Sequence, residues 1–426
     1  MYKNILIGSG LSSLGFLENI KKDFSFEVYD KNLYYGGHAH SFNLNNFFFD
    51  EGAHILHSKD EEFLQYIGAN DDKKILEFQS IVTNFYKGKE IGYPIQFNLK
   101  DLSFSEKIEY LISHLSRSKD INKSENYFEW LLASYGKFLS NKYYSLYTKK
   151  YWRTDPRHMS VNWVKGRLAE KKLLDTIKSL FFKINETSLV YNRFKYPKKN
   201  GFFNFFDEKY SKFDLNLNHE IKEIDIIKKK IYFKNNNVMN YNVLVSAIPL
   251  IDYKNIISNI PKEIYDCLLS LKHTSLITYN YKIKKKINYN FHWCYFYDLD
   301  IPISRMSILN NFSSNKEDHY FIQGEVFYRN DEIIDIEAYD KKTRNHIIKF
   351  FKLDSENEII FEQKKLIDKA YPVPLIGDIE KIDIIKKWLN ENNIFPIGLY
   401  GNWKFMWSDQ TFNNGKEAAQ MINKLL

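Results

Sequence analysis

The sequence predicts an α/β protein whose domains interleave along the chain: a Rossmann-like domain built from separated segments, an inserted helical domain and a sheet-rich domain. Three observations lead to this prediction. The first 30 residues read as a strand, a glycine turn, a helix and a second strand. Residues 101–185 have few glycines or prolines and repeat apolar residues at helical spacing, whereas 261–375 read as a sheet-rich segment. A chain of 426 residues also exceeds the usual size of one hydrophobic core.

The amino-terminal segment predicts a βαβ unit. "NILIGSG" reads as a short buried strand that runs into glycines, and a second strand through Phe26 and Val28 ends at Asp30. Between the two strands, four apolar residues share one helix face: Leu11, Leu14, Leu17 and Ile20. This order of elements is the start of a Rossmann-like fold.

The turn after the first strand predicts a dinucleotide site. Gly8 permits the tight turn and Gly10 lets the backbone approach a pyrophosphate, which the helix N-terminus from about Leu11 would attract. Asp30 follows Gly10 by about 20 positions, where an acid binds the ribose hydroxyls. Ser13 stands where a third glycine usually allows close packing of helix and strand. An ordinary turn is the alternative, but strand, helix and acid in register favour the site.

A second glycine pair selects FAD rather than NAD. "YDKNLYYGGHAH" places Gly36 and Gly37 just after the second strand, where in flavoproteins of this class the chain passes beside the FAD pyrophosphate and ribityl chain. His38 follows the pair directly and is assigned to the same cofactor site. The fold class is therefore an FAD-binding Rossmann-like domain with an inserted helical domain and a β-sheet substrate domain.

Four histidines in this region raise the alternative of a metal site. They are His38, His40, His54 and His57. Zinc sites accept imidazole but usually show closer ligand spacing with cysteine or acidic partners, so no metal is expected. We expect His40 and His57 to be structural and His54, within "DEGAHILH", to lie against the flavin ring.

The rest of the chain is assigned from its periodicity. "YNVLVSAIP" reads as the strand that returns to the cofactor domain, and the final helix is expected to open with Asn413 and Gly415, so that its N-terminus faces the flavin ribityl or phosphate. An ordinary amphipathic closing helix is the alternative. The expected ranges are 1–60, 200–260 and 376–426 for the FAD-binding domain, 101–185 for the helical domain, and 61–100, 186–199 and 261–375 for the sheet-rich substrate domain.

The composition indicates a cytoplasmic enzyme that does not bind nucleic acid. The net charge of +8 comes from 61 basic and 53 acidic residues, and the lysines are scattered instead of forming one basic patch. Cys267 and Cys294 are the only cysteines, which excludes a disulfide framework and suits a reducing compartment. The start of the chain has too short an apolar stretch for a signal peptide, and no run approaches the roughly 18 apolar residues of a membrane span.

Five segments in order resemble the flavin-dependent UDP-galactopyranose mutases, especially the eukaryotic-type branch and its bacterial relatives. The segments are "FFFDEGAHILHS", "YTKKYWRTDPRHMSVNWVKGRLAE", "FHWCYFYDLDIPISRMSI", "AYPVP" and "GLYGNWKFMWSDQTFNNGKEAA". The resemblance extends along most of the chain.

The resemblance implies a site for a nucleoside diphosphate. Arg167 and Arg305 match the family's diphosphate arginines, and guanidinium groups suit this role because they bind phosphates bidentately. Four aromatic residues match the family's substrate site: Trp152, Trp293, Tyr295 and Tyr371. The alternatives are surface salt bridges for the arginines and core packing for the rings. Replacing either arginine by alanine is expected to weaken substrate binding without changing stability.

"IGYPIQFNL" resembles the segment that holds uracil in this family. Tyr93 would stack on the base and Gln96 would lie near its polar edge, a combination suited to a pyrimidine. A strand entry at Pro94 is the alternative interpretation.

Some positions depart from the family pattern. Leu399 and Phe405 stand where the family has an arginine and a tyrosine, and Ile95 replaces an aromatic residue. Asp409, assigned to the substrate site, replaces the usual asparagine. The lost guanidinium and hydroxyl indicate that the sugar or the nucleotide differs from UDP-galactose.

The implied activity is the interconversion of pyranose and furanose forms of a nucleoside-diphosphate sugar through an adduct of the sugar with N5 of the reduced flavin, for surface polysaccharide or capsule synthesis. NADPH or another reductant would reduce the FAD, and a homo-oligomer is compatible with the family. The first alternative is an FAD-dependent amine-oxidase-like oxidoreductase, which gives no reason for arginines beside tryptophans. A catalytically silent binding protein is the second, and it would explain Leu399 and Phe405.

Overall fold

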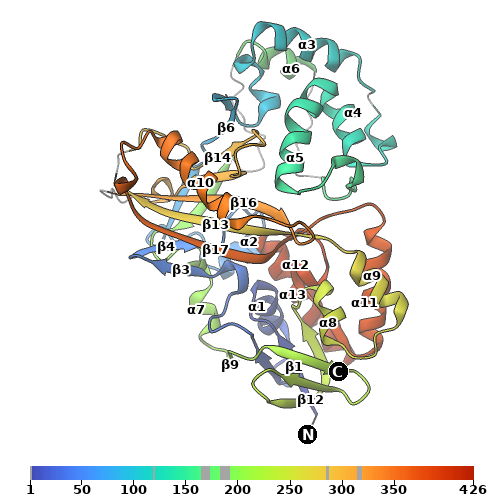
Figure 1. Ribbon diagram of the computed structural model, residues 1–426. Helices are drawn as coiled ribbons and strands as arrows, with labels where there is room; N and C mark the ends of the chain where they lie inside the picture. The colour runs from blue at the N-terminus through green and yellow to red at the C-terminus, as the bar shows by residue number, and fades with distance from the viewer. Residues whose placement is uncertain (1, 119, 165–172, 183–191, 285–286, 314–318) are drawn as a thin grey trace. The chain divides into compact units, whose positions relative to one another are not determined.

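The computed structural model describes the chain except for residues 1, 119, 165–172, 183–191, 285–286 and 314–318 (Figure 1). The chain divides into two units. The first contains Met1–Ile75, Lys199–Leu271 and Gly377–Leu426, and the second contains Leu76–Lys198 and Lys272–Ile376. The three domain ranges expected from the sequence stay a prediction. The α/β fold class, with a Rossmann-like domain and multi-stranded sheets, is confirmed.

The first unit is built on a mainly parallel sheet. Its strands run in the order β10-β11-β12-β1-β2-β9, and β18 pairs with β12. The pairs β12–β1, β1–β2, β2–β9 and β12–β18 are parallel, and β10 and β11 extend the sheet from β12 by antiparallel pairing. Their bounds are β1 Lys3–Ile7, β2 Phe26–Tyr29, β9 Leu215–Asn216, β10 Ile221–Asp225, β11 Lys230–Phe233, β12 Val238–Ser246 and β18 Ile394–Pro396. The predicted βαβ start and the returning strand in "YNVLVSAIP" are therefore correct.

Helices cover both faces of this sheet because its central strands are apolar on both sides. Ile5 and Ile7 of β1 pack in one core, which also receives Leu268 of α9 and Ile385 of α11. Leu6 points into the opposite core with residues of α1 and α13. The helices are α1 Leu11–Asn19, α2 Glu61–Tyr66, α7 Asp207–Tyr210, α8 Tyr253–Ile256, α9 Lys262–Ser270, α11 Asp378–Glu391, α12 Gly398–Gly401 and α13 Ser408–Leu425. A hairpin of β3 Ser41–Leu44 and β4 Phe47–Asp50 completes the unit.

Two glycines bring α1 and α13 into direct contact (Figure 1). A Cβ atom on Gly15 would lie 2.0 Å from the carbonyl oxygen of Phe412, and one on Gly415 would lie 1.8 Å from that of Ser12. Both distances are far below contact separation, so only glycine fits at either position.

The second unit contains a mainly antiparallel sheet in the order β17-β13-β16-β15-β14-β6-β7. The bounds are β6 Val82–Tyr86, β7 Lys89–Gly92, β13 His273–Ile283, β14 Trp293–Phe296, β15 Arg305–Ile308, β16 Tyr320–Arg329 and β17 Ile359–Pro372. A smaller pair joins β5 Ile75–Gln79 to β8 Arg193–Pro197. The helix α10, Ile336–Phe351, places Ile347 and Phe351 in the core of the large sheet.

The helices expected between 101 and 185 are present in the described residues of this unit. They are α3 Phe104–Leu115, α4 Tyr127–Leu139, α5 Ser145–Tyr151 and α6 Leu173–Ser179, and a π-helical turn at Ser140–Tyr144 links α4 to α5. Ser103 starts α3 with a capping box, in which its hydroxyl accepts from the Glu106 N–H and the Glu106 carboxylate accepts from the Ser103 N–H.

Candidate functional site

The glycine turn of the first unit leaves room for a phosphate at the N-terminus of α1. Gly8 has φ +90° and donates its N–H to the Tyr29 carbonyl oxygen at 2.8 Å, which closes the turn between β1 and α1. Gly10 caps α1 without a side-chain hydrogen bond, and a Cβ built on it meets no atom within 4 Å. There is therefore open space beside Gly10 at the N-terminus of α1, where an anion could approach the first N–H groups of the helix.

The second glycine pair lies directly against this turn. Gly36 donates its N–H to the carbonyl oxygen of Ser9 at 2.9 Å. Gly37 has φ +57°, and a Cβ on it would lie 3.2 Å from the Cα of Gly10. The two segments that the sequence assigns to one cofactor thus meet in space, and their backbones form a cradle that fits the pyrophosphate of a dinucleotide.

Asp30 is buried and supports the turn. Its Oδ2 accepts from the Ser9 N–H at 2.7 Å and from the Ser9 hydroxyl at 2.6 Å, and its Oδ1 accepts from the Asn32 N–H at 2.8 Å. A carboxylate has about four lone-pair sites, so these bonds leave capacity for a ribose hydroxyl. Ser13 is fully buried in α1, and its hydroxyl has no hydrogen-bond partner among the described residues.

The four histidines lie in the first unit at different places. His38 follows the glycine pair, and its Nδ1 lies 2.5 Å from Oε2 of the buried Glu51. His54 stacks on Phe202 with ring centroids 5.2 Å apart. His40 stacks on Tyr34, and His57 contacts Trp407 edge-on. Among the described residues, no three His, Cys, Asp or Glu side chains converge as a metal site would require.

The expected start of the final helix at Asn413 is wrong. The helix α13 begins at Ser408, and the Gln410 side chain accepts from the Trp407 N–H at 3.1 Å in a cap. Asn413 therefore lies inside the helix and donates its amide to Asp60 Oδ2 at 2.5 Å.

Near the start of α13, Asp409 Oδ2 accepts from the Ser58 hydroxyl at 2.5 Å, so this predicted substrate residue links α13 to the segment before α2. Gly415 lies in the middle of α13 at the α1 contact. Leu399 lies in α12 and Phe405 follows that helix, both in the first unit.

In the second unit, Arg305 forms a buried ion pair. It opens β15 opposite Glu325 of β16, and its Nε and Nη2 lie 2.9 and 2.8 Å from Glu325 Oε1. The side chain of Arg305 is 17% exposed and that of Glu325 only 1%. Burial by itself lowers the pKa of Arg305, but the Glu325 carboxylate outweighs it and holds that pKa well above its ordinary value. The guanidinium is charged and held in one orientation.

Tyrosine rings surround this arginine. Tyr295 of β14 lies between Tyr93 and Tyr147, with ring centroids 5.3 and 5.2 Å away. Tyr151 of α5 packs on Tyr371 at the end of β17 with centroids 5.8 Å apart. Burial raises the pKa of both Tyr147 and Tyr151 well above the ordinary value, so these hydroxyls stay neutral. The Tyr295 hydroxyl accepts a hydrogen bond from the indole of Trp293 at 3.1 Å.

Trp152 and Gln96 are buried in this unit. Trp152 directly follows α5 and contacts Trp163 and Tyr371, with centroids 5.2 and 6.2 Å away. Gln96 lies in the turn after Tyr93, and its side-chain oxygen accepts from the Tyr144 hydroxyl at 2.6 Å. Arg167, the second predicted diphosphate ligand, lies outside the described residues.

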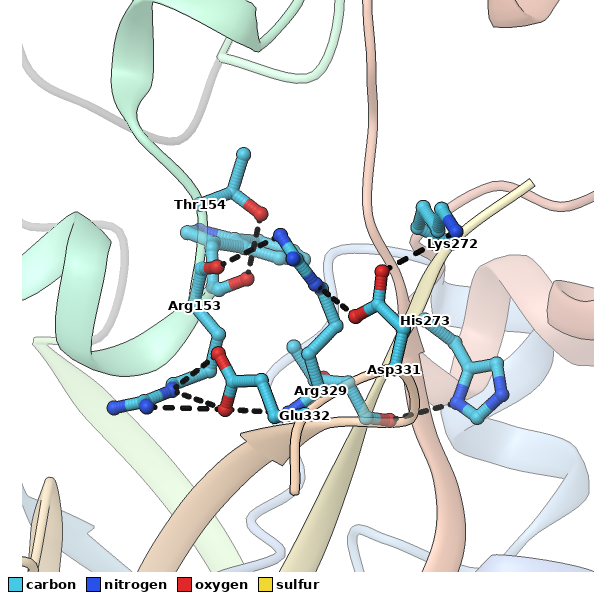
Figure 2. Close-up of polar contacts among 9 residues, drawn as sticks. Arg153, Thr154, Lys272, His273, Arg329, Asp331 and Glu332 are labelled. Carbon is cyan, nitrogen blue, oxygen red and sulfur yellow. Dashed lines mark hydrogen bonds and ion pairs between the residues drawn. The ribbon is translucent and has the colours of Figure 1, made fainter. Parts of the chain in front are cut away.

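An ion-pair network anchors the segment that carries Trp152. Figure 2 shows the Arg153 guanidinium facing the Glu332 carboxylate, with Nε and Nη2 each 3.0 Å from Oε2. Arg329 pairs with Asp331 and donates from Nη1 to the carbonyl oxygen of Arg153 at 3.2 Å. Arg153 has φ +52°, an uncommon conformation for a residue other than glycine, and these contacts hold it there.

Sequence reasoning missed Glu325, Tyr147 and Tyr151. In "YYSLYTKKY", Tyr144, Tyr147 and Tyr151 recur at intervals of three and four residues, which places them along one helix face. Glu325 is the one charged residue in the otherwise uncharged stretch "YFIQGEVFY". A lone carboxylate in such a strand indicates a buried cation partner.

Part of the first unit matches a known family model, that of the NAD(P)-binding Rossmann-like domain, over residues 6–68. No sequence among the curated proteins matches the chain. None of the described helices is long and apolar enough to cross a membrane.

Several solved structures share the fold. One is a reduced UDP-galactopyranose mutase, with a TM-score of 0.89, 20% sequence identity, and coverage of 100% of this chain and 96% of that chain. A protein assigned as a protoporphyrinogen oxidase from Exiguobacterium sp. 255-15 has a TM-score of 0.78 and 13% identity, covering 100% of this chain and 99% of that chain. A double mutant of putrescine oxidase has a TM-score of 0.64 and 10% identity, covering 99% and 98%. At these identities the likeness shows the fold.

Proposed function

We propose that the chain is an FAD-dependent mutase that interconverts the pyranose and furanose forms of a nucleoside-diphosphate sugar. The first unit would hold FAD, and the second would hold the sugar nucleotide on Arg305 and the surrounding tyrosines. One observation carries the proposal: a charged, oriented and largely buried guanidinium lies among tyrosine rings. The likeness to a solved UDP-galactopyranose mutase supports it.

The first unit has the features that FAD binding needs. The cradle of Gly10 and Gly37 approaches the pyrophosphate through backbone atoms alone, and the N-terminus of α1 supplies N–H donors. Asp30 lies at the end of β2, where an adenosine ribose binds in this fold class. A second glycine segment against the first favours FAD over NAD. Ser13 and His38 are proposed to line the same site, and His54 to lie against the flavin ring.

Arg305 is suited to a diphosphate because Glu325 binds only its Nε and Nη2 edge. A guanidinium has five N–H donors, so the pair with Glu325 and the contact with the Tyr295 hydroxyl still leave donors for phosphate oxygens. Since the Glu325 pair holds the orientation before substrate arrives, little side-chain entropy is lost on binding. Arg167 is proposed as the second ligand of the diphosphate.

The aromatic residues would contact the sugar and the base. Ring faces bind the apolar faces of sugars and pyrimidines, and neutral tyrosine hydroxyls donate hydrogen bonds without adding charge near a diphosphate. Tyr93 is proposed to stack on the base with Gln96 near its edge. Trp152, Trp293, Tyr295 and Tyr371 are proposed to line the sugar site, and Asp409 is proposed as a further substrate residue.

When bound and reduced, FAD supplies a nucleophilic nitrogen, N5, for the anomeric carbon of the sugar. The protein's share of the reaction is to hold the departing diphosphate. Arg305 stabilises the charge that the diphosphate gains as its bond to the sugar breaks, and it keeps the diphosphate in place until that bond forms again. The reaction has no net redox change, so NADPH or another reductant would be needed only to reduce the flavin. The natural sugar, a role in surface polysaccharide synthesis and membership of the eukaryotic-type branch remain part of the proposal.

The test compares oxidised and dithionite-reduced protein. The purified chain should be yellow or take up FAD on reconstitution, and only the reduced form should interconvert pyranose and furanose nucleotide sugars. An oxidase-like enzyme, which the putrescine oxidase likeness keeps as the competing candidate, would consume oxygen in proportion to product. A colourless protein that cannot be reconstituted with FAD would contradict the proposal at its first step.

A further inference from the structure

A cavity of about 440 Å³ opens on the second unit beside the end of α5. Its walls come from α5 and the residues after it, from residues 299–302, from β16 and from α10. Neither Arg305 nor any residue that the sequence assigns to substrate lines it. Small-molecule sites usually have volumes of 300–1,000 Å³, so the cavity is large enough for a ligand of its own.

One side of the cavity is apolar. Val326 and Phe327 of β16 and the segment with Ile301 and Pro302 form this wall. The ring of Phe327 also contacts Tyr151, with centroids 4.4 Å apart, so the wall is part of the packed core. A ligand with a flat or branched apolar portion could bury that portion here without rearranging the protein.

The polar part of the lining holds three basic residues and two acidic ones. Lys149 pairs with Asp155 at 3.0 Å, and Arg153 pairs with Glu332 through Nε and Nη2 as Figure 2 shows. The pair with Glu332 uses Nε and Nη2 of Arg153 and does not involve Nη1.

Lys150 is the residue that distinguishes this cavity from a surface depression. It is only 4% exposed, and its Nζ donates to the carbonyl oxygens of Phe296 and Asp298, both at 2.9 Å. An ammonium group has three N–H donors, so the two carbonyls leave one donor of this cavity-lining residue for another acceptor. Neither hydrogen bond goes to a carboxylate, and a buried cation without one is costly.

The groups around Lys150 do not neutralise it. Burial lowers the pKa of Lys150 to about 7. Asp298, Asp300 and Cys294 raise this pKa electrostatically, but their effect is smaller than that of burial. His346 of α10 lies within electrostatic range, and burial lowers its pKa to about 4, so its ring is neutral at pH 7. A ligand anion at Nζ would supply the missing negative charge.

We propose that this cavity binds a small amphiphilic anion, with a carboxylate or phosphate on Lys150 and Arg153 and an apolar portion on Phe327 and Pro302. The site is separate from the one proposed for the sugar nucleotide and does not depend on FAD.

The test uses 8-anilinonaphthalene-1-sulfonate, a fluorescent amphiphilic anion, on the full-length protein. Benzoate and phenyl phosphate should each displace the probe, and the stronger of the two identifies the preferred head group. UDP-galactose should not displace it. Lys150→Met, which keeps the length of the side chain and removes the charge, should weaken binding about tenfold or more, and the exposed lysine variant Lys262→Met should not.

A second variant covers the case in which Lys150→Met does not fold. Leu299 lines the cavity and is 61% exposed, so Leu299→Glu should fold and should repel the anion. The matched control is Leu33→Glu, an exposed leucine on the first unit, which should bind the probe as wild type does. Calorimetry at pH 8 in buffers of different ionisation enthalpy should show proton uptake on binding, because the anion favours charged Lys150. The proposal is overturned if the probe binds Leu299→Glu as it binds wild type, or if UDP-galactose displaces it and benzoate does not.

Discussion

Replacing Arg305 should destabilise the second unit as well as remove a diphosphate ligand. Arg305→Met leaves the carboxylate of Glu325, 1% exposed, without its cation. Breaking a buried ion pair from one side costs about 3–5 kcal/mol, and because Arg305 keeps 17% exposure we expect a value near the lower end, about 3 kcal/mol. The sequence alone gave the opposite expectation, an unchanged stability, since it does not reveal the pairing with Glu325.

A double-mutant cycle measures this coupling. Arg305→Met, Glu325→Leu and the double variant are compared by calorimetric unfolding with nothing bound. For a unit of this size, about 3 kcal/mol lowers Tm by about 6–12 °C. The double variant should recover much of the loss, because an apolar pair replaces a stranded charge. If the two single effects add within about 0.5 kcal/mol, the residues are not coupled and the reasoning is refuted.

The same variants separate stability from binding. Arg305→Met should weaken binding of UDP about 10- to 150-fold through loss of a charged contact, and the double variant should stay equally weak although its Tm recovers. Arg305→Lys should restore binding only in part, because an ammonium lacks the planar fork. Binding that follows Tm across the set would show that Arg305 acts through the fold alone.

Three further predictions concern other parts of the chain. Gly10→Ala should fold with unchanged stability and lose FAD affinity, whereas Gly415→Ala should destabilise the first unit by several kcal/mol, since its Cβ would meet a carbonyl oxygen at 1.8 Å. Asp30→Ala should weaken FAD binding by about 1.5–3 kcal/mol, measured by flavin fluorescence, through a lost ribose bond and a loosened turn at Ser9. Burial lowers the pKa of His292 to about 4. Between pH 6.5 and 4 the unfolded chain therefore binds a proton that the folded chain does not. As the pH is lowered through this range, the free energy of unfolding should decrease by up to about 3 kcal/mol.

The two glycine predictions and the His292 prediction each have an outcome that would contradict them. Gly10→Ala that retains FAD with wild-type affinity would show that the cofactor does not approach this turn. A Gly415→Ala protein with wild-type Tm would mean that α1 and α13 can separate at little cost. His292→Gln should reduce the loss of stability between pH 6.5 and 4. If stability depends on pH as it does in wild type, groups other than His292 cause the loss.

The sequence determined the local elements of the first unit. Leu11 to Ile20 carry a helical repeat, and Phe26 and Val28 alternate as a strand requires, so β1, α1 and β2 follow from neighbours along the chain. Gly8 and the Gly36–Gly37 pair could also be identified, because positive φ favours glycine at these positions. Gly10 is identified by its place in the dinucleotide turn, where the open space at its Cβ position is needed by the ligand and not by the fold.

The start of α13 could not be obtained in this way. Asn413 and Gly415 are poor in a helix interior, and their presence suggested a helix boundary. The tertiary structure overrides that preference, because Gly415 is where α13 touches Ser12 of α1 and no side chain fits. The cap at Trp407 then sets the true start.

In the candidate substrate site, the sequence predicted the residue types and the tertiary structure decided which of them meet. The sequence selected Arg305, Tyr295 and Tyr371 by their residue types and their resemblance to a family. Tyr295 and Arg305 lie on the consecutive strands β14 and β15, but Tyr371 comes from β17, far along the chain. Strand register placed Glu325 opposite Arg305, and the packing of α5 brought Tyr151 to Tyr371. Local sequence encodes which backbone a segment prefers, whereas an ion pair between two strands depends on how those strands align, and many weak contacts spread over the whole unit decide that alignment.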